Sequence, residues 1–248
     1  MSGPVPSINA CADLVTPSVP VAYPRLLMQV VQARGLDSTE LLRTARLRAD
    51  VLEEPDGLIS AMHYALMIMR ALSLTDDACL GCEMGLRMSP TMHGPLGWGS
   101  LSSSTLRDAL NVCAPYFRLA SPFVEAKVSF HDERVRLTLD ELSSLGAVRQ
   151  FVMESCLIGV HRGAQLLLGQ PDLLADVALR FSWPRPVAFD RYAARLPATC
   201  FDAQANQLDY AASYLDYPLM LADSLAARRA VAQCEQDWVR LDPAGASC

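Results

Sequence analysis

The sequence has few charged residues and no long uninterrupted apolar run. Charged residues make up 19% of its 248 positions and apolar residues 51%, a balance that suits a buried core and argues against disorder. No stretch approaches the roughly 18 consecutive apolar residues of a membrane-spanning helix. The N-terminal segment contains Asp13 and lacks the basic start of a secretory signal. We therefore expect a cytoplasmic globular protein that does not associate with membranes.

Basic residues are also scarce, which limits the partners of the chain. The sequence has 21 Lys and Arg against 27 Asp and Glu, and its net charge is −6. Affinity for nucleic acid depends chiefly on neutralising phosphates with Lys and Arg, and no run of basic residues is present. We therefore expect that this chain does not hold DNA by itself.

Catalytic motifs are absent from the sequence. There is no Gly-x-Ser-x-Gly, no His-Glu-x-x-His and no glycine loop of the Walker or dinucleotide type. The four histidines share no catalytic spacing, and Ser102, Ser103 and Ser104 precede a predicted helix, where serines cap backbone donors. The chain is therefore not expected to be an enzyme, and no cofactor is predicted.

Eight cysteines are present, at irregular spacing that does not suggest a disulfide framework. Cys79-Leu-Gly-Cys82 is the one distinctive pair. It is compatible with a redox switch or with half of a zinc site. No second pair with suitable spacing exists, and His63 or His93 would complete a site only by coincidence of folding. Two small core thiols are the favoured interpretation, and no metal site is predicted.

The first third of the chain is predicted to be helical. Residues 1–20 are predicted to be a flexible tail and 21–90 a helical subdomain, with apolar residues at helical spacing from Tyr23 to Arg34 and Ser60 as a helix cap. This subdomain is rich in methionine, and its methionines include Met62, Met67, Met69, Met84 and Met88. Such flexible side chains could adapt to an apolar ligand, but packing within the core is the favoured interpretation. The Gly- and Ser-rich segment 92–104 is predicted to be a loop, and Thr105 is predicted to cap the helix that follows.

Residues 91–217 are predicted to form an α+β sensor domain. Apolar and polar residues alternate over 124–130 and 135–139, which predicts a hairpin with one wet face. Residues 145–168 form an almost wholly apolar helical run, so this helix should be buried on more than one side. Further strands are expected near 177–183 and 201–214. The fold class is α+β, with helices packed on an antiparallel sheet after the helical subdomain. A last helix is expected over 218–240 and the start of a linker over 241–248.

An ordered set of short motifs resembles the N-terminal effector-binding and dimerisation domain of AraC-family transcription regulators, of the arabinose-binding type found in ornithine-utilisation regulators. The residues that carry the resemblance are His93-Gly-Pro-Leu-Gly97, Leu101-Ser-Ser-Ser-Thr-Leu106, Arg149 with Phe151 and Glu154, Ala205-Asn-Gln-Leu208, Leu215-Asp-Tyr-Pro-Leu219 and Cys234-Glu235. The resemblance implies a bacterial, dimeric regulator that binds a small-molecule effector. It also implies that DNA is contacted by a C-terminal helix-turn-helix domain that is missing here.

Candidate effector-binding residues are those able to wall a pocket or to grip a polar ligand, since ligand sites are mostly apolar with a few convergent polar groups. They are Trp98, Tyr116, Arg149, Glu154, His161 and Trp183. Arg149 and Glu154 have an alternative as an internal ion pair, and this structural interpretation is slightly favoured. Glu154 would suit a basic amino acid, whereas a fatty acid would need an apolar tunnel ended by an Arg or His.

The last helix carries an apolar stripe, and the resemblance implies that such a helix forms the dimer contact. The candidate contact residues are Leu221, Leu225, Ala232 and Trp238. Two alternatives stay open beside the ligand-sensing domain. One is a dimerisation module that binds no effector, and the other is a thiol redox sensor that uses Cys79 and Cys82.

Overall fold

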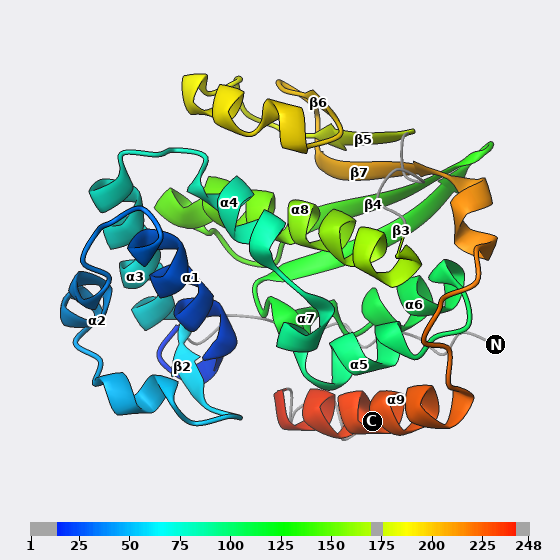
Figure 1. Cartoon of the computed structure of the whole chain (residues 1–248), viewed down its shortest axis with the longest axis horizontal. Helices are drawn as coiled ribbons and strands as arrows, with labels where there is room; N and C mark the ends of the chain where they lie inside the picture. The colour runs from blue at the N-terminus through cyan, green and yellow to red at the C-terminus, as the bar shows by residue number, and fades with distance from the viewer. Residues whose placement is uncertain (1–13, 170–175, 242–248) are drawn as a thin grey trace.

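A computed structural model of the chain describes residues 14–169 and 176–241. It combines helices with two sheets (Figure 1), which confirms the α+β class. The α-helices are α1 Ala22–Gln32, α2 Thr39–Ala45, α3 Ala61–Thr75, α4 Leu80–Arg87, α5 Pro95–Leu101, α6 Leu106–Cys113, α7 Phe117–Ala120, α8 Arg149–Leu168 and α9 Ser224–Leu241. The strands are β1 Pro17–Pro20, β2 Leu58–Ser60, β3 Val124–His131, β4 Arg134–Glu141, β5 Val177–Arg180, β6 Ala198–Cys200 and β7 Asn206–Ala211. No helix within the described ranges is long and apolar enough to cross a bilayer.

Helices α1 to α3 and the small β1–β2 sheet form one end of the molecule (Figure 1). The helix predicted from Tyr23 is confirmed as α1, and the Ser60 hydroxyl caps α3 by accepting from the backbone N–H of His63 at 3.3 Å. The tail predicted over 1–20 is wrong at its end, because Pro17–Pro20 pairs antiparallel with Leu58–Ser60. Residues 1–13 of that prediction lie outside the described residues.

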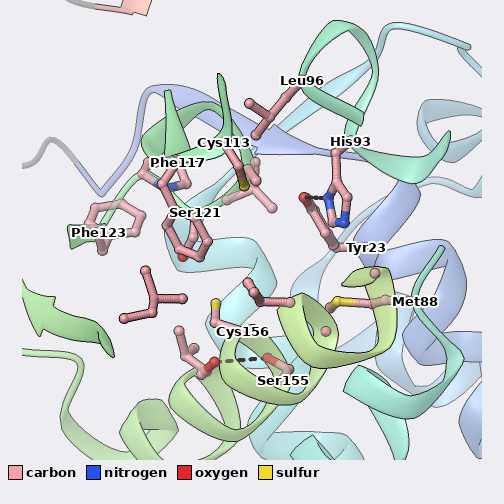
Figure 2. A pocket seen from close by; sticks show the side chains of 18 of the residues that line it. Tyr23, Met88, His93, Leu96, Cys113, Phe117, Ser121, Phe123, Ser155 and Cys156 are labelled. Atoms are coloured by element: carbon pink, nitrogen blue, oxygen red, sulfur yellow. Dashed lines mark hydrogen bonds between the residues drawn. The ribbon is translucent and has the colours of Figure 1, made fainter. Parts of the chain in front are cut away.

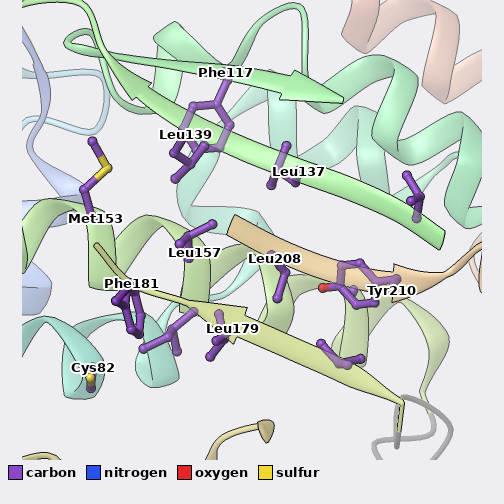
Figure 3. Packing of buried hydrophobic residues seen from close by; sticks show 14 of the residues in the cluster. Cys82, Phe117, Leu137, Leu139, Met153, Leu157, Leu179, Phe181, Leu208 and Tyr210 are labelled. Carbon is purple, nitrogen blue, oxygen red and sulfur yellow. The ribbon is translucent and has the colours of Figure 1, made fainter. Parts of the chain in front are cut away.

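The larger sheet has five strands in the order β3-β4-β7-β5-β6. All neighbouring pairs are antiparallel except β5 and β6, which are parallel. The predicted hairpin is confirmed as β3–β4, with Val128 opposite Leu137. On one face the alternating apolar residues of β4, β5 and β7 pack against α8, as Figure 3 shows for Leu137, Leu179, Leu208 and Leu157.

A buried carboxylate holds three strands together through side chains outside that apolar layer. Asp209 on β7 accepts from Arg136 on β4 at 2.6 Å and from Arg180 on β5 at 3.1 Å. Burial alone would raise the pKa of Asp209, but the two arginines outweigh it and hold the pKa below its ordinary value. The hydrogen-bonded ion pairs therefore fix the order of the three central strands.

Helix α8 runs through the centre of the molecule, and its predicted burial on several sides is confirmed. The sheet covers one side and α4 packs closely on another. Glycines allow this approach, because a Cβ on Gly81 would lie 2.5 Å from the Phe151 carbonyl oxygen and one on Gly85 2.8 Å from Ile158 Cβ. Larger residues at these two positions would force the helices apart.

The loop predicted over 92–104 is wrong, because Pro95–Leu101 forms helix α5. Its glycines serve close packing instead of flexibility. A Cβ on Gly97 would lie 1.6 Å from the Pro90 carbonyl oxygen, and one on Gly99 would lie 3.3 Å from Ala230 of α9. Tertiary contacts thus override the low helix propensity of glycine here.

The last helix begins at Ser224 and not at Pro218. Segment 218–223 runs alongside 102–105, with the Leu219 N–H donating to the Ser104 carbonyl at 3.0 Å and the Asp223 N–H to the Ser102 carbonyl at 2.9 Å. Backbone donors used in this way cannot also form helical bonds. Asp223 then caps α9 by accepting from the backbone N–H groups of Leu225 and Ala226. The predicted linker lies outside the described residues from 242 onward.

Candidate effector cavity

A cavity of about 360 Å³ lies between α3, α8 and the group α5 to α7 (Figure 2). Pockets of about 300–1,000 Å³ are typical of sites for small molecules. The helical end of the molecule contributes one wall and the α+β part the others. Its lining includes Tyr23, Tyr64, Ile68, Met88, His93, Leu96, Cys113, Phe117, Ser121, Phe123, Leu137, Phe151, Ser155, Cys156, Gly163 and Tyr210. Among the described residues, no Asp, Glu, Lys or Arg lines the cavity.

The polar groups of the cavity are uncharged at neutral pH. Tyr23 Oη lies 2.7 Å from His93 Nδ1 (Figure 2). Burial lowers the pKa of His93 to about 4 and raises that of Tyr23, so the imidazole is neutral. Burial also raises the pKa of Cys113 to about 12 and of Cys156 to about 11, which keeps both as thiols. The cavity therefore offers a mostly apolar surface with uncharged polar groups on its wall, among them the hydrogen-bonded pair Tyr23 and His93 and the hydroxyl groups of Ser155 and Tyr210.

The His93-Gly-Pro-Leu-Gly97 motif places His93 in that pair. Gly94 has φ +55° and ψ −133°, a backbone conformation open to few residues other than glycine. Pro95 starts α5 immediately afterwards, and Gly97 lies against the Pro90 carbonyl. The sharp turn directs His93 toward Tyr23 of α1, so the motif builds part of the cavity wall.

One end of the cavity reaches the surface. Three lining residues, Leu14, Met62 and Met69, are also exposed on the outside of the molecule. The methionine-rich pattern of the sequence divides accordingly: Met62, Met69 and Met88 line the cavity, while Met67 and Met84 are fully buried in the core. This pattern was the sequence signal that pointed to a cavity, although core packing was the favoured interpretation.

The six predicted effector-binding residues do not line this cavity. Trp98 is 55% exposed on α5. Tyr116 meets Trp238 of α9 edge-on, with 6.1 Å between ring centroids. Trp183 stacks on Phe181 at 4.8 Å. An effector role for the six stays a prediction, and other residues form the cavity.

Arg149 and Glu154 do not pair with each other, so the ion-pair alternative is wrong. Arg149 forms an ion pair with Glu141, donates to the Ser182 hydroxyl at 3.1 Å and lies over the Trp183 ring at 5.6 Å. Glu154 points to the other side of α8, toward α4. The five-residue separation places the two side chains on different faces of the helix.

Two ionisable groups of α8 are deeply buried. Glu154 is 1% exposed, and burial raises its pKa to about 8. His161 is 3% exposed and stacks on Tyr210 with 6.3 Å between centroids. Burial lowers the pKa of His161 to about 4, and the neighbouring Arg162 charge acts in the same direction. Both groups are therefore largely uncharged at neutral pH.

The structure brings Glu154 to the cysteine pair. The ligand atoms of Cys79, Cys82 and Glu154 all lie within 4.8 Å of one another, and all three side chains are buried. A hydrogen bond with Cys79 and burial raise the pKa of Cys82. Cys79 is the N-cap of α4, so the pair lies at the start of this helix. No spacing signal connects Glu154 to the pair, because the contact depends on how α4 packs on α8.

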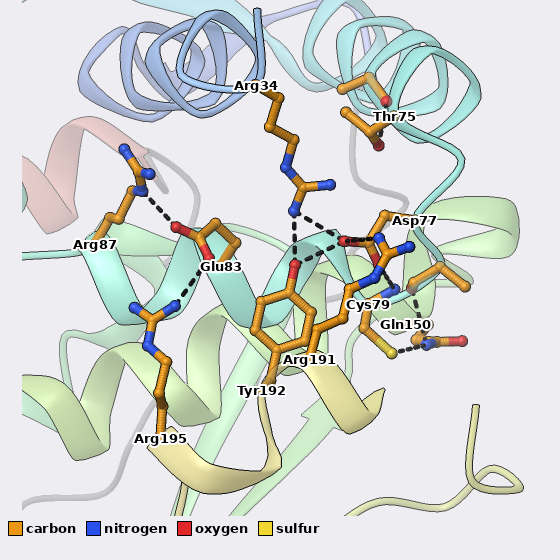
Figure 4. Close-up of polar contacts among 12 residues, drawn as sticks. Arg34, Thr75, Asp77, Cys79, Glu83, Arg87, Gln150, Arg191, Tyr192 and Arg195 are labelled. Carbon is orange, nitrogen blue, oxygen red and sulfur yellow. Dashed lines mark hydrogen bonds and ion pairs between the residues drawn. The ribbon is translucent and has the colours of Figure 1, made fainter. Parts of the chain in front are cut away.

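A network of polar side chains lies beside this cluster (Figure 4). The buried Asp77 carboxylate accepts from Arg34 at 2.8 Å, from the Tyr192 hydroxyl at 2.7 Å and from the Cys79 N–H at 2.9 Å. Arg191 lies 3.7 Å from the same carboxylate. The network ties the turn after α1 and the segment just before α4 to segment 187–195.

The sequence matches the arabinose-binding domain of AraC transcription regulators, N-terminal, over residues 35–219. The ornithine utilization regulator of Pseudomonas aeruginosa is 30% identical over 236 residues, which are 95% of this chain and 68% of that protein. An uncharacterized HTH-type transcriptional regulator of Mycobacterium tuberculosis is 25% identical over 223 residues, which are 87% of this chain and 64% of that protein. The chain thus spans about two thirds of the length of these relatives.

A solved structure shares the fold. The crystal structure of the transcriptional regulator CdpR from Pseudomonas aeruginosa superposes with a TM-score of 0.61 and 14% sequence identity. The superposition covers 88% of this chain and 64% of that one.

Proposed function

Since this chain belongs to the AraC family of transcription regulators, we propose that it senses a small-molecule effector in its interior cavity and passes the signal to DNA-binding segments outside this chain. The observation that carries the proposal is a cavity of about 360 Å³ walled by both parts of the molecule. A ligand there touches α1 and α3 as well as α5 to α8. It acts as a switch if it favours one arrangement of these elements over another.

The lining points to an apolar effector of the fatty-acid type that binds in an uncharged form, as the protonated acid or an ester. A basic amino acid would bring positive charges into a cavity in which none of the described lining residues has a carboxylate to pair with them, and an unpaired buried charge is costly. The polar end of the effector would meet Tyr23 and His93. With Tyr23 donating to Nδ1, the neutral His93 ring carries its proton on Nε2 and can donate it to an acceptor on the ligand.

The regulator is proposed to act as a homodimer in the cytoplasm, without catalysis. Helix α9 is the proposed contact. Leu225 and Ala232 are exposed on it, and Leu221 is exposed just before it. Trp238 instead packs on its own protomer, against Tyr116 and with the Arg118 guanidinium 5.4 Å from its ring. Among the residues first expected at the contact, the three exposed ones therefore fit a partner best.

Thermal unfolding tests the effector proposal. Gly163 on α8 lines the cavity, and a Cβ there would meet nothing within 4 Å. We expect a long-chain fatty acid or its neutral methyl ester to raise the Tm of the wild-type chain, because a ligand of the native state stabilises it by mass action. The Gly163→Leu side chain would occupy the cavity and abolish the shift.

The matched control is Gln165→Leu, on the same helix but away from the cavity lining. It should respond like the wild type. Stabilisation by ornithine or arginine that exceeds that by the apolar ligands would contradict the proposed effector class. A chain that no apolar ligand stabilises would favour the dimerisation module without effector.

A further inference from the structure

Cys79, Cys82 and Glu154 form a second cluster of functional groups in the protein. Cys79 and Cys82 come from the start of α4 and Glu154 from the middle of α8. Of the residues that the structure describes, these form the one group of three His, Cys, Asp or Glu ligand atoms close enough to share an ion. None of the three lines the cavity.

The second observation is the state of the Glu154 carboxyl group. Its Oε1 accepts from Gln150 Nε2 at 2.9 Å, whereas the buried Oε2 makes no hydrogen bond of normal geometry among the described residues, although Cys82 lies close enough to interact with the carboxyl group. A buried polar atom without a partner is destabilising and calls for an explanation. One carboxylate oxygen of Glu154 lies within 4.8 Å of both sulfur atoms, and a Cβ on Gly81 would come within 2.8 Å of Oε2.

We propose that Cys79, Cys82 and Glu154 bind a zinc-type divalent cation that joins α4 to α8. Two thiolates and one carboxylate are ligands that Zn²⁺ accepts in a tetrahedral site, with a water molecule in the fourth position. The two sulfur ligands disfavour Mg²⁺ and Ca²⁺, which prefer oxygen. Binding replaces the protons of two thiols and one carboxylic acid and releases all three to solvent.

The surroundings suit such an ion. Gln150 Nε2 also lies 3.9 Å from Cys79 Sγ, so one amide contacts two of the ligands, as outer-shell partners do. Three anionic ligands and a divalent cation leave one negative charge. Arg34 and Arg191 face the single carboxylate of Asp77 next to Cys79. The network therefore supplies one compensating positive charge.

A disulfide between the cysteines explains less of the geometry. It would use both sulfur atoms and leave Glu154 Oε2 without a partner. Both thiols are also fully buried, which shields them from oxidants.

Metal content and Co²⁺ spectroscopy of the full 248-residue chain test the proposal. We expect the reduced chain, purified without chelator, to retain about one zinc ion. After chelation, Co²⁺ alone should give the charge-transfer absorption of cobalt-thiolate bonds. The variants C82S and E154Q should lose tight binding of Co²⁺, whereas the controls C200S and E83Q should bind it like the wild type. Glu83 is a matched control because it lies next to Cys82 on α4 and pairs with Arg87.

If C82S or E154Q fails to fold, Gln150→Ala serves in its place because Gln150 is only partly buried. Loss of this outer-shell amide should weaken binding about 10- to 100-fold. A folded, reduced wild-type chain that retains no zinc and gives no cobalt-thiolate band would overturn the proposal. So would ready formation of a Cys79–Cys82 disulfide by a chain that binds no metal, which would favour a redox switch.

Discussion

At the residue scale, burial sets the charge state of the interior. His93 and His161 are both neutral because the folded chain withholds water from their rings. His93 is also placed in the cavity wall, whereas His161 stacks on Tyr210 and has a buried Nδ1 without a partner among the described residues. Each ring must stay uncharged for the native packing to persist, and stability should therefore depend on pH.

For His161 the sign of that dependence follows from its pKa, which is about 4 in the folded chain against an ordinary value of 6.5. Between these values the unfolded chain binds more protons, so the stability contributed by a neutral His161 is present above pH 6.5 and is lost as the pH falls toward 4. Between pH 7 and pH 5, the His161→Phe variant should lose about 2 kcal/mol less of its free energy of unfolding than the wild-type chain loses. Urea unfolding at the two pH values measures this difference.

Leu166→Ala is the control, because it changes an exposed side chain on the same helix that carries no titratable group and should leave the pH dependence as in the wild type. An equally steep acid destabilisation of His161→Phe and the wild type would show that His161 is not the group responsible.

Local residue roles were predictable where the partner lies close in sequence. Ser60 and Thr105 cap their helices as expected, because the bond spans only three residues. The surroundings of Glu154 were not predictable, since Cys82 reaches it only through the packing of α4 on α8. Arg149 was likewise expected near Glu154 but pairs with Glu141, which is brought there by the end of β4.

At the scale of elements, periodicity predicted the amphipathic helices and the hairpin but failed where packing overrides local preference. The segment around Gly97 and Gly99 has the composition of a loop, yet it is helical because its glycines allow contact with Pro90 and α9. Residues 218–223 have the apolar pattern of a helix, yet their backbone bonds to 102–105. The first error arises because glycines without a Cβ allow close packing of α5. The second arises because the partners of segment 218–223 lie more than a hundred residues away in the sequence.

We predict that the exposed face of helix α9 forms the dimer contact. Its buried face, with Ala230 and Cys234, packs on its own protomer, while Leu225 and Val239 are about half exposed. Replacing both exposed residues with Glu should convert a dimer into a monomer, because charges would be buried in the contact. Sedimentation equilibrium of the 248-residue chain measures the mass. Leu166→Glu, an exposed position on α8, should leave the dimer intact, and a double variant that still sedimented as a dimer would exclude α9 as the contact.

At the scale of the whole molecule, two cores share one cavity. One core is built mainly from residues between Val19 and Met88 and the other from the sheet, α8 and the elements around it. Phe151 belongs to the first core although α8 underlies the sheet, so the two cores meet along this helix. The division of the chain at residue 90 stays a prediction.

The α+β class was predictable from the sequence, because it follows from local patterns. The cavity was not, because its walls combine residues from Leu14 to Leu215 that become neighbours only in the folded chain.

The central claim is that the cavity between the two cores is the effector site. It is tested most directly by anomalous diffraction from crystals of this chain grown with a bromine-labelled long-chain fatty acid. We expect a bromine peak among the residues around Phe117, Phe123 and Cys156 and no such peak in Gly163→Leu crystals. A bromine peak found only at the protein surface would contradict the assignment of the cavity as the effector site. So would a peak that Gly163→Leu crystals show at another position.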